Sequence, residues 1–99
     1  MKVKFSTKQL EEVFNKQEVI KSKLPLAVVK SYCKAVHFIK ATDSIISIYR
    51  STWYHLEKYN GHYSMRLNEQ WRLEIEIVKD ELQVISILQI SNHYKEIFR

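Results

Sequence analysis

The chain has 99 residues, enough for one hydrophobic core and too few for two, so residues 1–99 are predicted to form a single domain. Hydrophobic residues make up 45% of the sequence, a proportion that excludes an intrinsically disordered protein. The net charge of +5 indicates nucleic acid or an acidic protein as partner, although many small proteins are basic without a specific reason.

The cysteine content and the apolar runs indicate the compartment. Cys33 is the only cysteine, so no intramolecular disulfide can form, as is usual in a reducing cytoplasm. The first residues show no apolar stretch of a secretory signal, and no later run approaches membrane-spanning length. We therefore expect a cytoplasmic protein that does not bind a membrane. The four histidines have no recognised ligand spacing, which predicts neither a metal site nor a cofactor.

The first half of the chain reads as a strand followed by helices. Residues 2–5 alternate lysine with apolar side chains and predict a short strand. The tetrapeptide that starts at Ser6 resembles a capping box, so a helix over 7–16 is expected with Ser6 as its N-cap. A second helix is predicted over 24–41, with Pro25 in its first turn and one apolar stripe facing a sheet.

The second half is dominated by strands. Residues 43–60 lack a clean periodicity, and we expect a partly ordered connection or a short strand there. A hairpin over 63–79 follows, and the last strand, 82–90, is apolar on both faces and so predicted to be central in the sheet. The element order predicts an α+β fold, with a short N-terminal strand and two helices packed on an antiparallel sheet. A short helical tail is expected at the carboxyl end.

The predicted hairpin places two arginines on one face. A three-residue loop at 68–70 keeps each face consistent, because Leu67 then lies opposite Trp71 and Arg66 lies opposite Arg72. Two like charges directly opposite each other are unfavourable. An anion between them would remove the conflict, and a phosphate is the obvious candidate.

Cleavage of an RNA phosphodiester fits these residue types. The substrate carries its own nucleophile, the 2′-OH, so the protein needs a general acid or base and cations that stabilise charge on the phosphate. Arg66 and Arg72 supply cations on a rigid strand. An unperturbed histidine has a pKa near neutrality, so His93, just past the last strand, suits the acid or base role. His55 and Lys58 add charge or proton transfer.

Each of these residues also has a less specific interpretation. Tyr63 and Tyr94 can stack on unpaired bases, although aromatic side chains lie more often in a core or a protein interface. The two hairpin arginines can simply pair with Glu74 and Glu76 on a solvated face. His93 can be an ordinary terminal surface histidine. The case for a nuclease therefore depends on the combination of residues.

The segment from Gly61 to Leu73, Gly-x-Tyr-Ser-Met-Arg-Leu-Asn-x-Gln-Trp-Arg-Leu, resembles the RelE/ParE superfamily. It is most similar to the HigB-like (plasmid maintenance killer) branch, which carries a Gly-x-Tyr/Trp-Ser-Ile-Arg-Ile-Asn-x-Gln-Tyr/Trp-Arg-Ile hairpin. That branch also has a histidine after its last strand, which matches the ending Ile-Ser-Asn-His-Tyr at residues 90–94. The predicted order of elements also suits the RelE-like fold.

The resemblance implies a toxin of a bacterial type II toxin–antitoxin system. Such a toxin cleaves mRNA in the ribosomal A site without a cofactor and is neutralised by a HigA-like helix-turn-helix antitoxin. By position, Arg66 and Arg72 correspond to the arginines that contact the phosphate, and His93 corresponds to the histidine of the terminal Asp-Tyr-His, with Tyr94 as a displaced tyrosine. The residues expected to bind RNA are His55, Lys58, Tyr63 and Asn92.

The carboxyl end departs from the family pattern. Ser91-Asn92-His93 stands where well-known members have Asp-Tyr-His. Two alternatives to the nuclease stay open. One is a ParE-like toxin that inhibits DNA gyrase without cleaving RNA, and the other is a catalytically impaired relative that acts as an antitoxin-bound regulator.

Overall fold

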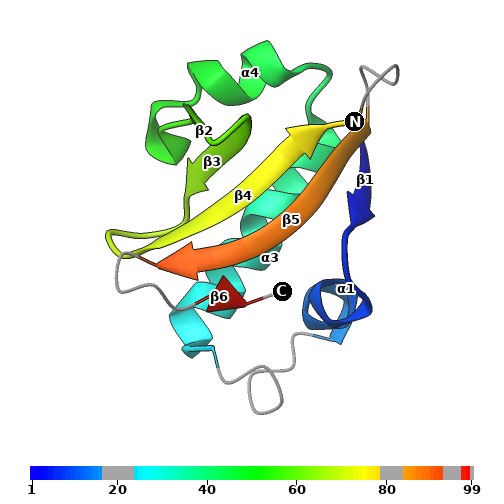
Figure 1. Cartoon of the computed structure of the whole chain (residues 1–99), viewed down its shortest axis with the longest axis vertical. Coiled ribbons are helices and arrows are strands. Elements are labelled where there is room, and N and C mark those ends of the chain that lie inside the picture. Colours follow the sequence, from blue (N-terminus) through cyan, green and yellow to red (C-terminus); the bar gives the residue numbers. More distant parts are fainter. Residues whose placement is uncertain (17–23, 79–83, 93–96, 99) are drawn as a thin grey trace.

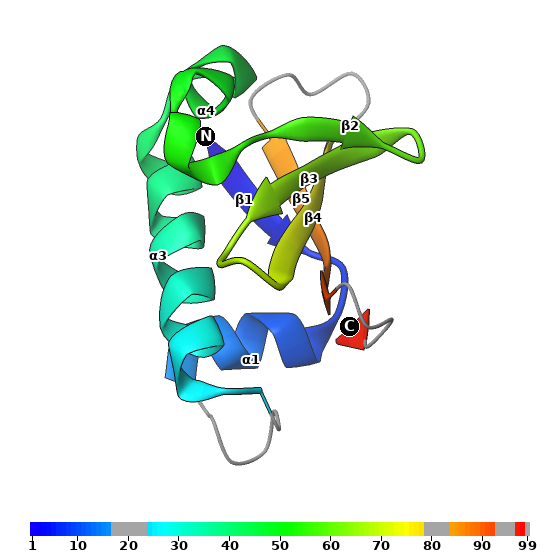
Figure 2. The ribbon, with the colours of Figure 1, turned by 90° about the vertical axis from the view of Figure 1, so that its left-hand side faces the viewer.

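A mixed β-sheet forms the centre of this α+β fold, and helices pack against it (Figure 1). The computed structural model describes residues 1–16, 24–78, 84–92 and 97–98. The strand order is β1–β5–β4–β3–β2, and a short sixth strand pairs with β5 off this path. In Figure 2 the longest helix, α3, stands along one side of the sheet, while α1 crosses its lower end.

The described residues form six strands. They are β1 (Lys2–Phe5), β2 (Glu57–Tyr59), β3 (His62–Arg66), β4 (Trp71–Ile77), β5 (Val84–Asn92) and β6 (Ile97–Phe98). The predicted central position of the last strand is confirmed, because β5 pairs with β1 on one side and β4 on the other. The prediction of an all-antiparallel sheet is wrong, since β1 runs parallel to β5. A long connection through the helices allows that parallel pairing.

The two predicted long helices are confirmed, with boundaries shifted by a residue or two. The helices are α1 (Lys8–Lys16), α3 (Leu26–Ala41), α4 (Ile45–Arg50) and the 3-10 turn η1 (Thr52–Tyr54). Thr7, rather than Ser6, caps α1, because the Leu10 N–H donates to the Thr7 hydroxyl at 3.2 Å. The Ser6 hydroxyl instead donates to the Leu88 carbonyl of β5 at 2.8 Å. Pro25 is the N-cap residue of α3.

Residues 43–60 are more ordered than expected. The short strand expected as one possibility is present as β2, but the sequence analysis did not predict the helix α4. The Ser44 side chain accepts a hydrogen bond from the Ser47 N–H and so caps α4. Asn60 and Gly61 have φ angles of 49° and 84° and form the two-residue turn between β2 and β3. This left-handed backbone is the one that Asn-Gly turns of hairpins require.

The predicted helical tail is wrong for the described residues at the carboxyl end. Ile97–Phe98 form β6, antiparallel to Ile90 and Ser91 of β5. The last residue pair between β1 and β5 is Phe5 with Ile87. Beyond Ile87, the edge of β5 that faces β1 has no partner in β1. Strand β6 pairs with this part of the edge and supplies backbone partners that a helix would not.

The predicted register of the central hairpin is confirmed. Arg66 and Arg72 are direct partners across β3 and β4. The Leu67 N–H donates to the Trp71 carbonyl at 2.9 Å, which places those two residues at the mouth of the loop. Asn68 closes the loop, because its side-chain oxygen accepts the N–H of Trp71 and of the residue before it, each at 2.8 Å.

The hydrophobic core lies between the sheet and the helices. Leu73 and Ile75 of β4 are fully buried there, as is Tyr32 of α3. The Tyr32 hydroxyl donates to the Leu10 carbonyl of α1 at 2.8 Å, so it joins the two helices. Burial raises the pKa of Tyr32, with a smaller contribution from Cys33, and keeps the phenol neutral. None of the helices in the described ranges has both the length and the apolar character needed to cross a bilayer.

Candidate functional site

A polar cleft of about 660 Å³ opens on the face of the sheet that carries the hairpin arginines. Strand alternation places Ser64 of β3 on the same face as Arg72 and Glu74 of β4, opposite the buried Leu73 and Ile75. The lining of the cleft includes Glu57, His62, Ser64, Arg72, Glu74 and Asn92. A guanidinium, two carboxylates and an imidazole therefore line one open space.

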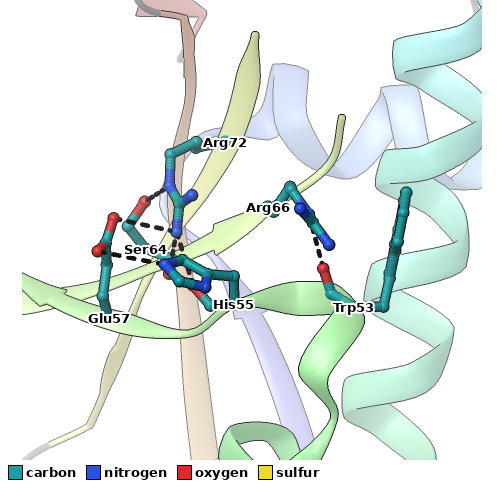
Figure 3. A network of polar contacts seen from close by, with 6 residues as sticks. All are labelled: Trp53, His55, Glu57, Ser64, Arg66 and Arg72. Atoms are coloured by element: carbon teal, nitrogen blue, oxygen red, sulfur yellow. Dashed lines mark hydrogen bonds and ion pairs between the residues drawn. The ribbon is translucent and has the colours of Figure 1, made fainter. Parts of the chain in front are cut away.

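Arg72 is held firmly in this cleft (Figure 3). Its Nη2 donates to the backbone carbonyls of Ser64 and His55, each at 2.9 Å, and its Nε donates to the Ser64 hydroxyl. The same Nη2 lies 3.4 Å from Oε1 of Glu57. Burial lowers the pKa of Arg72, Glu57 opposes that effect and Arg66 adds to it. Arginine starts from so high a pKa that the guanidinium stays charged at neutral pH.

Arg66 turns away from Arg72 (Figure 3). Its Nε donates to the Trp53 carbonyl at 2.8 Å, and its guanidinium carbon lies 4.5 Å from the centre of the Trp53 ring. The predicted conflict between the two cations is thus reduced without an anion between them, because each guanidinium has a separate set of partners. Trp53 is 56% exposed, so this stacked pair lies at the surface.

The predicted solvated face of paired charges is wrong. Among the described residues, Arg72 forms an ion pair with Glu57, and Glu74 is hydrogen-bonded to His62. Glu74 is only 4% exposed, whereas Glu76 is exposed. The two glutamates therefore have different environments despite their shared position on one strand face.

Glu74 is bound on both carboxylate oxygens. Its Oε1 lies 2.6 Å from Nε2 of His62, and its Oε2 accepts a hydrogen bond from Nε2 of Gln89 at 2.7 Å. Burial is the largest influence and raises the pKa of Glu74, but hydrogen bonds from Gln89, Ser91 and His62 together lower it below its ordinary value. Glu74 is therefore an ionised carboxylate at neutral pH.

The residues predicted to bind RNA are not all brought together. Asn92 lines the cleft. His55 lies beside it, with Nε2 3.8 Å from Oε2 of Glu57 and a side chain that is 65% exposed. Lys58 pairs with Tyr63 across β2 and β3, and Tyr63 packs against the core, so alternation directs both away from the cleft. His93 and Tyr94 lie outside the described residues.

Sequence reasoning missed the acidic and imidazole part of this site. His62, Ser64 and Arg66 are two residues apart along β3 and so lie on one face of the strand. The hairpin pattern in the sequence could therefore have placed His62 on the same face as Arg66. The Asn60-Gly61 dipeptide is a strong hairpin signal that would have predicted β2, and with it the position of Glu57. No local signal marks Glu74 as buried, because its burial depends on the pairing of β4 with β5.

Two further observations concern metal ligands and known relatives. In the parts of the chain that the structure describes, no group of three or more His, Cys, Asp or Glu side chains is placed to bind a metal ion. Neither the protein-family models nor the curated proteins that were searched match this chain. We therefore infer the function from the geometry of the cleft and the chemistry of its side chains.

Proposed function

We propose that this protein is an endoribonuclease toxin of a type II toxin–antitoxin system, with a RelE-like fold, that cleaves mRNA on the ribosome. The observation that carries the proposal is the position of Arg72. Its guanidinium lies in a polar cleft on the rigid central hairpin, fixed by Ser64 and His55. These contacts use Nε and Nη2, so Nη1 is the nitrogen that can donate to a phosphate oxygen of an RNA backbone.

The proposed reaction uses the 2′-OH of the RNA as nucleophile. It attacks the adjacent phosphorus, the bond to the 5′-oxygen breaks, and the products are a 2′,3′-cyclic phosphate and a 5′-OH. Arg72 stabilises the extra negative charge on the phosphate as the transition state forms. His93, which follows the cleft residue Asn92 in the sequence, is the candidate to protonate the leaving 5′-oxygen.

Glu57 occupies the place that a phosphate would take. It contacts Arg72 at 3.4 Å, and its side chain is 53% exposed whereas that of Arg72 is 17% exposed, so the ion pair is exposed on the Glu57 side. Such pairs contribute at most about 1 kcal/mol, so a phosphodiester of RNA, which carries one negative charge, can displace one. In this proposal the Glu57 carboxylate holds Arg72 in place in the absence of substrate and is displaced when a phosphate binds.

The cleft also offers a surface for bases. Tyr59 lines it with a ring that is 53% exposed, and a base unstacked from mRNA can lie against such a ring. In this proposal the ribosomal A site presents the single-stranded mRNA. A HigA-like helix-turn-helix antitoxin from a neighbouring gene neutralises the toxin.

The experiment is induction of the protein in a bacterial host, with growth curves and primer extension on abundant mRNAs. The wild type is compared with Arg72→Ala and with Arg50→Ala, which removes an exposed arginine of α4 away from the cleft. New mRNA 5′ ends with the wild type and Arg50→Ala, but not with Arg72→Ala, would support the nuclease. DNA breaks without new mRNA ends would instead indicate gyrase poisoning. Equal cleavage by Arg72→Ala would show that the site is wrong.

A further inference from the structure

The pair formed by His62 and Glu74 has no part in the reaction described so far. The imidazole Nε2 and the carboxylate Oε1 are 2.6 Å apart, and the two side chains are 16% and 5% exposed. Gln89 holds the second carboxylate oxygen at 2.7 Å. The pair is thus largely removed from water, yet both residues line the cleft. A purely structural hydrogen-bonded pair has no need to lie beside the Arg72 guanidinium of a candidate active site.

The carboxylate decides which imidazole nitrogen carries the proton. An ionised carboxylate only accepts hydrogen bonds, so His62 must donate from Nε2. Nδ1 is then the nitrogen that carries a lone pair in the neutral ring and can take up a proton. If His62 becomes an imidazolium, Glu74 stabilises the new charge at hydrogen-bond distance. The carboxylate of a hydrolytic triad orients its histidine in a similar way, with the roles of Nδ1 and Nε2 exchanged.

The hairpin places this imidazole next to Arg72. His62 and Ser64 are neighbouring positions on one face of β3, and Ser64 lies opposite Glu74 in the register. Ser64 also accepts a hydrogen bond from Arg72. Tyr59 packs edge-on against the His62 ring, with 5.9 Å between ring centres, and so restricts how the ring tilts. The imidazole and the guanidinium are therefore held by one set of contacts around one cleft.

We propose that His62 is the general base of the reaction and that Glu74 is the residue that positions it. This inference rests on the proposed nuclease function. Nδ1 of His62 takes the proton of the 2′-OH as that oxygen attacks the phosphorus. The 5′-oxygen leaves with a proton from an acid on the other side of the scissile bond or from water. The imidazolium then returns its proton to solvent, so the cleavage consumes none.

The test measures single-turnover cleavage of mRNA on purified ribosomes. His62→Gln keeps an amide that can donate to Glu74, so it should fold, and we expect it to cleave at least about 100-fold more slowly, as loss of a general base predicts. His62→Ala should regain part of its activity when imidazole is added, whereas Arg72→Ala should not. His37→Ala, which removes an exposed histidine of α3, should cleave like the wild type.

The role of Glu74 has a separate readout. In ¹⁵N NMR spectra of the histidine rings, neutral His62 of the wild type should carry its proton on Nε2. Glu74→Gln should lose that preference, because an amide can donate as well as accept, and it should also slow cleavage. An unchanged tautomer in Glu74→Gln would overturn the positioning role.

The outcomes separate this inference from the nuclease proposal. Wild-type rates in His62→Gln, or a loss in folded His62→Ala that imidazole does not restore, would overturn the role of His62 while the nuclease stands. Failure of the wild type to cleave RNA would overturn both.

Discussion

Arg66 and Arg72 are direct partners across the central hairpin, yet their guanidinium groups point to different parts of the molecule (Figure 3). Arg72 is fixed in the polar cleft, whereas Arg66 stacks on the exposed ring of Trp53. The divergence separates two like charges that would otherwise meet. It also gives the two residues unequal roles in the proposed reaction, with Arg72 at the phosphate and Arg66 beside it.

The first prediction follows from the unequal roles of Arg66 and Arg72. Arg72→Ala should slow cleavage of ribosome-bound mRNA by about 100-fold to 1,000-fold, as expected when a group that stabilises transition-state charge is lost. Arg66→Ala should slow it by no more than about 10-fold, because Arg66 lies outside the cleft lining and, in the proposed reaction, adds only a nearby positive charge. Single-turnover rates at one salt concentration measure both. Equal losses in the two variants would mean that the arginines act together on one phosphate.

The second prediction concerns the carboxylate that pairs with Arg72. Glu57→Gln removes a negative charge that competes with phosphate, so binding of a short RNA should become several-fold tighter at low salt. The free energy of unfolding should change by less than about 1 kcal/mol, because the ion pair is exposed. Isothermal titration and urea unfolding measure the two effects. Glu76→Gln removes the same charge from an exposed position of β4 outside the cleft lining and is the matched control. RNA binding that is improved equally by both variants would exclude a specific role for Glu57.

The third prediction is a pH dependence of stability. The pKa of Glu74 is lower in the folded protein than in the unfolded chain, so its contribution to stability is complete above the ordinary pKa of about 4.3. It is lost as the pH falls from there through the folded pKa. Wild-type stability should therefore fall across that range more steeply than the stability of Glu74→Gln. At pH 7 Glu74→Gln should itself be less stable by about 1–3 kcal/mol, because its amide leaves a buried donor without its best partner. Parallel curves for the two proteins in urea unfolding at stepped pH would contradict this assignment.

The fourth prediction tests the contact between the helices. Tyr32→Phe leaves the Leu10 carbonyl without its buried donor, and the free energy of unfolding should fall by about 1–3 kcal/mol. Tyr49→Phe removes a hydroxyl from a side chain that is 70% exposed and should cost much less. Urea unfolding at neutral pH compares the two. A similar small change in both variants would mean that the hydrogen bond contributes little to stability.

The hairpin is the part of the fold that the sequence predicts best. The alternation around Arg66 and Arg72 admits one loop length that keeps both faces consistent, and that register is present. The apolar stripe of α3 likewise predicts a helix, because its residues recur at helical spacing and bury one side. Both signals are local, and local periodicity determines both elements.

The remaining features depend on contacts between distant segments. The pairing of β1 with β5 places Lys2 opposite Val84. The periodicity of a short edge strand does not show which other strand it pairs with. The register of β4 against β5 shifts between Glu74 and Ile75, which places Gln89 opposite Glu74. The binding of Glu74, and so the orientation of His62, follows from that pairing and could not be read from either strand alone.

The most direct test of the account is the chemistry of the RNA ends made by the purified protein on translating ribosomes. We predict a 2′,3′-cyclic phosphate, or the 3′-phosphate derived from it, on one RNA fragment and a 5′-OH on the other. Arg72→Ala should yield almost none of either. A 5′-phosphate paired with a 3′-OH, or the same ends in equal amounts from Arg72→Ala, would contradict the cleft as the site of RNA cleavage.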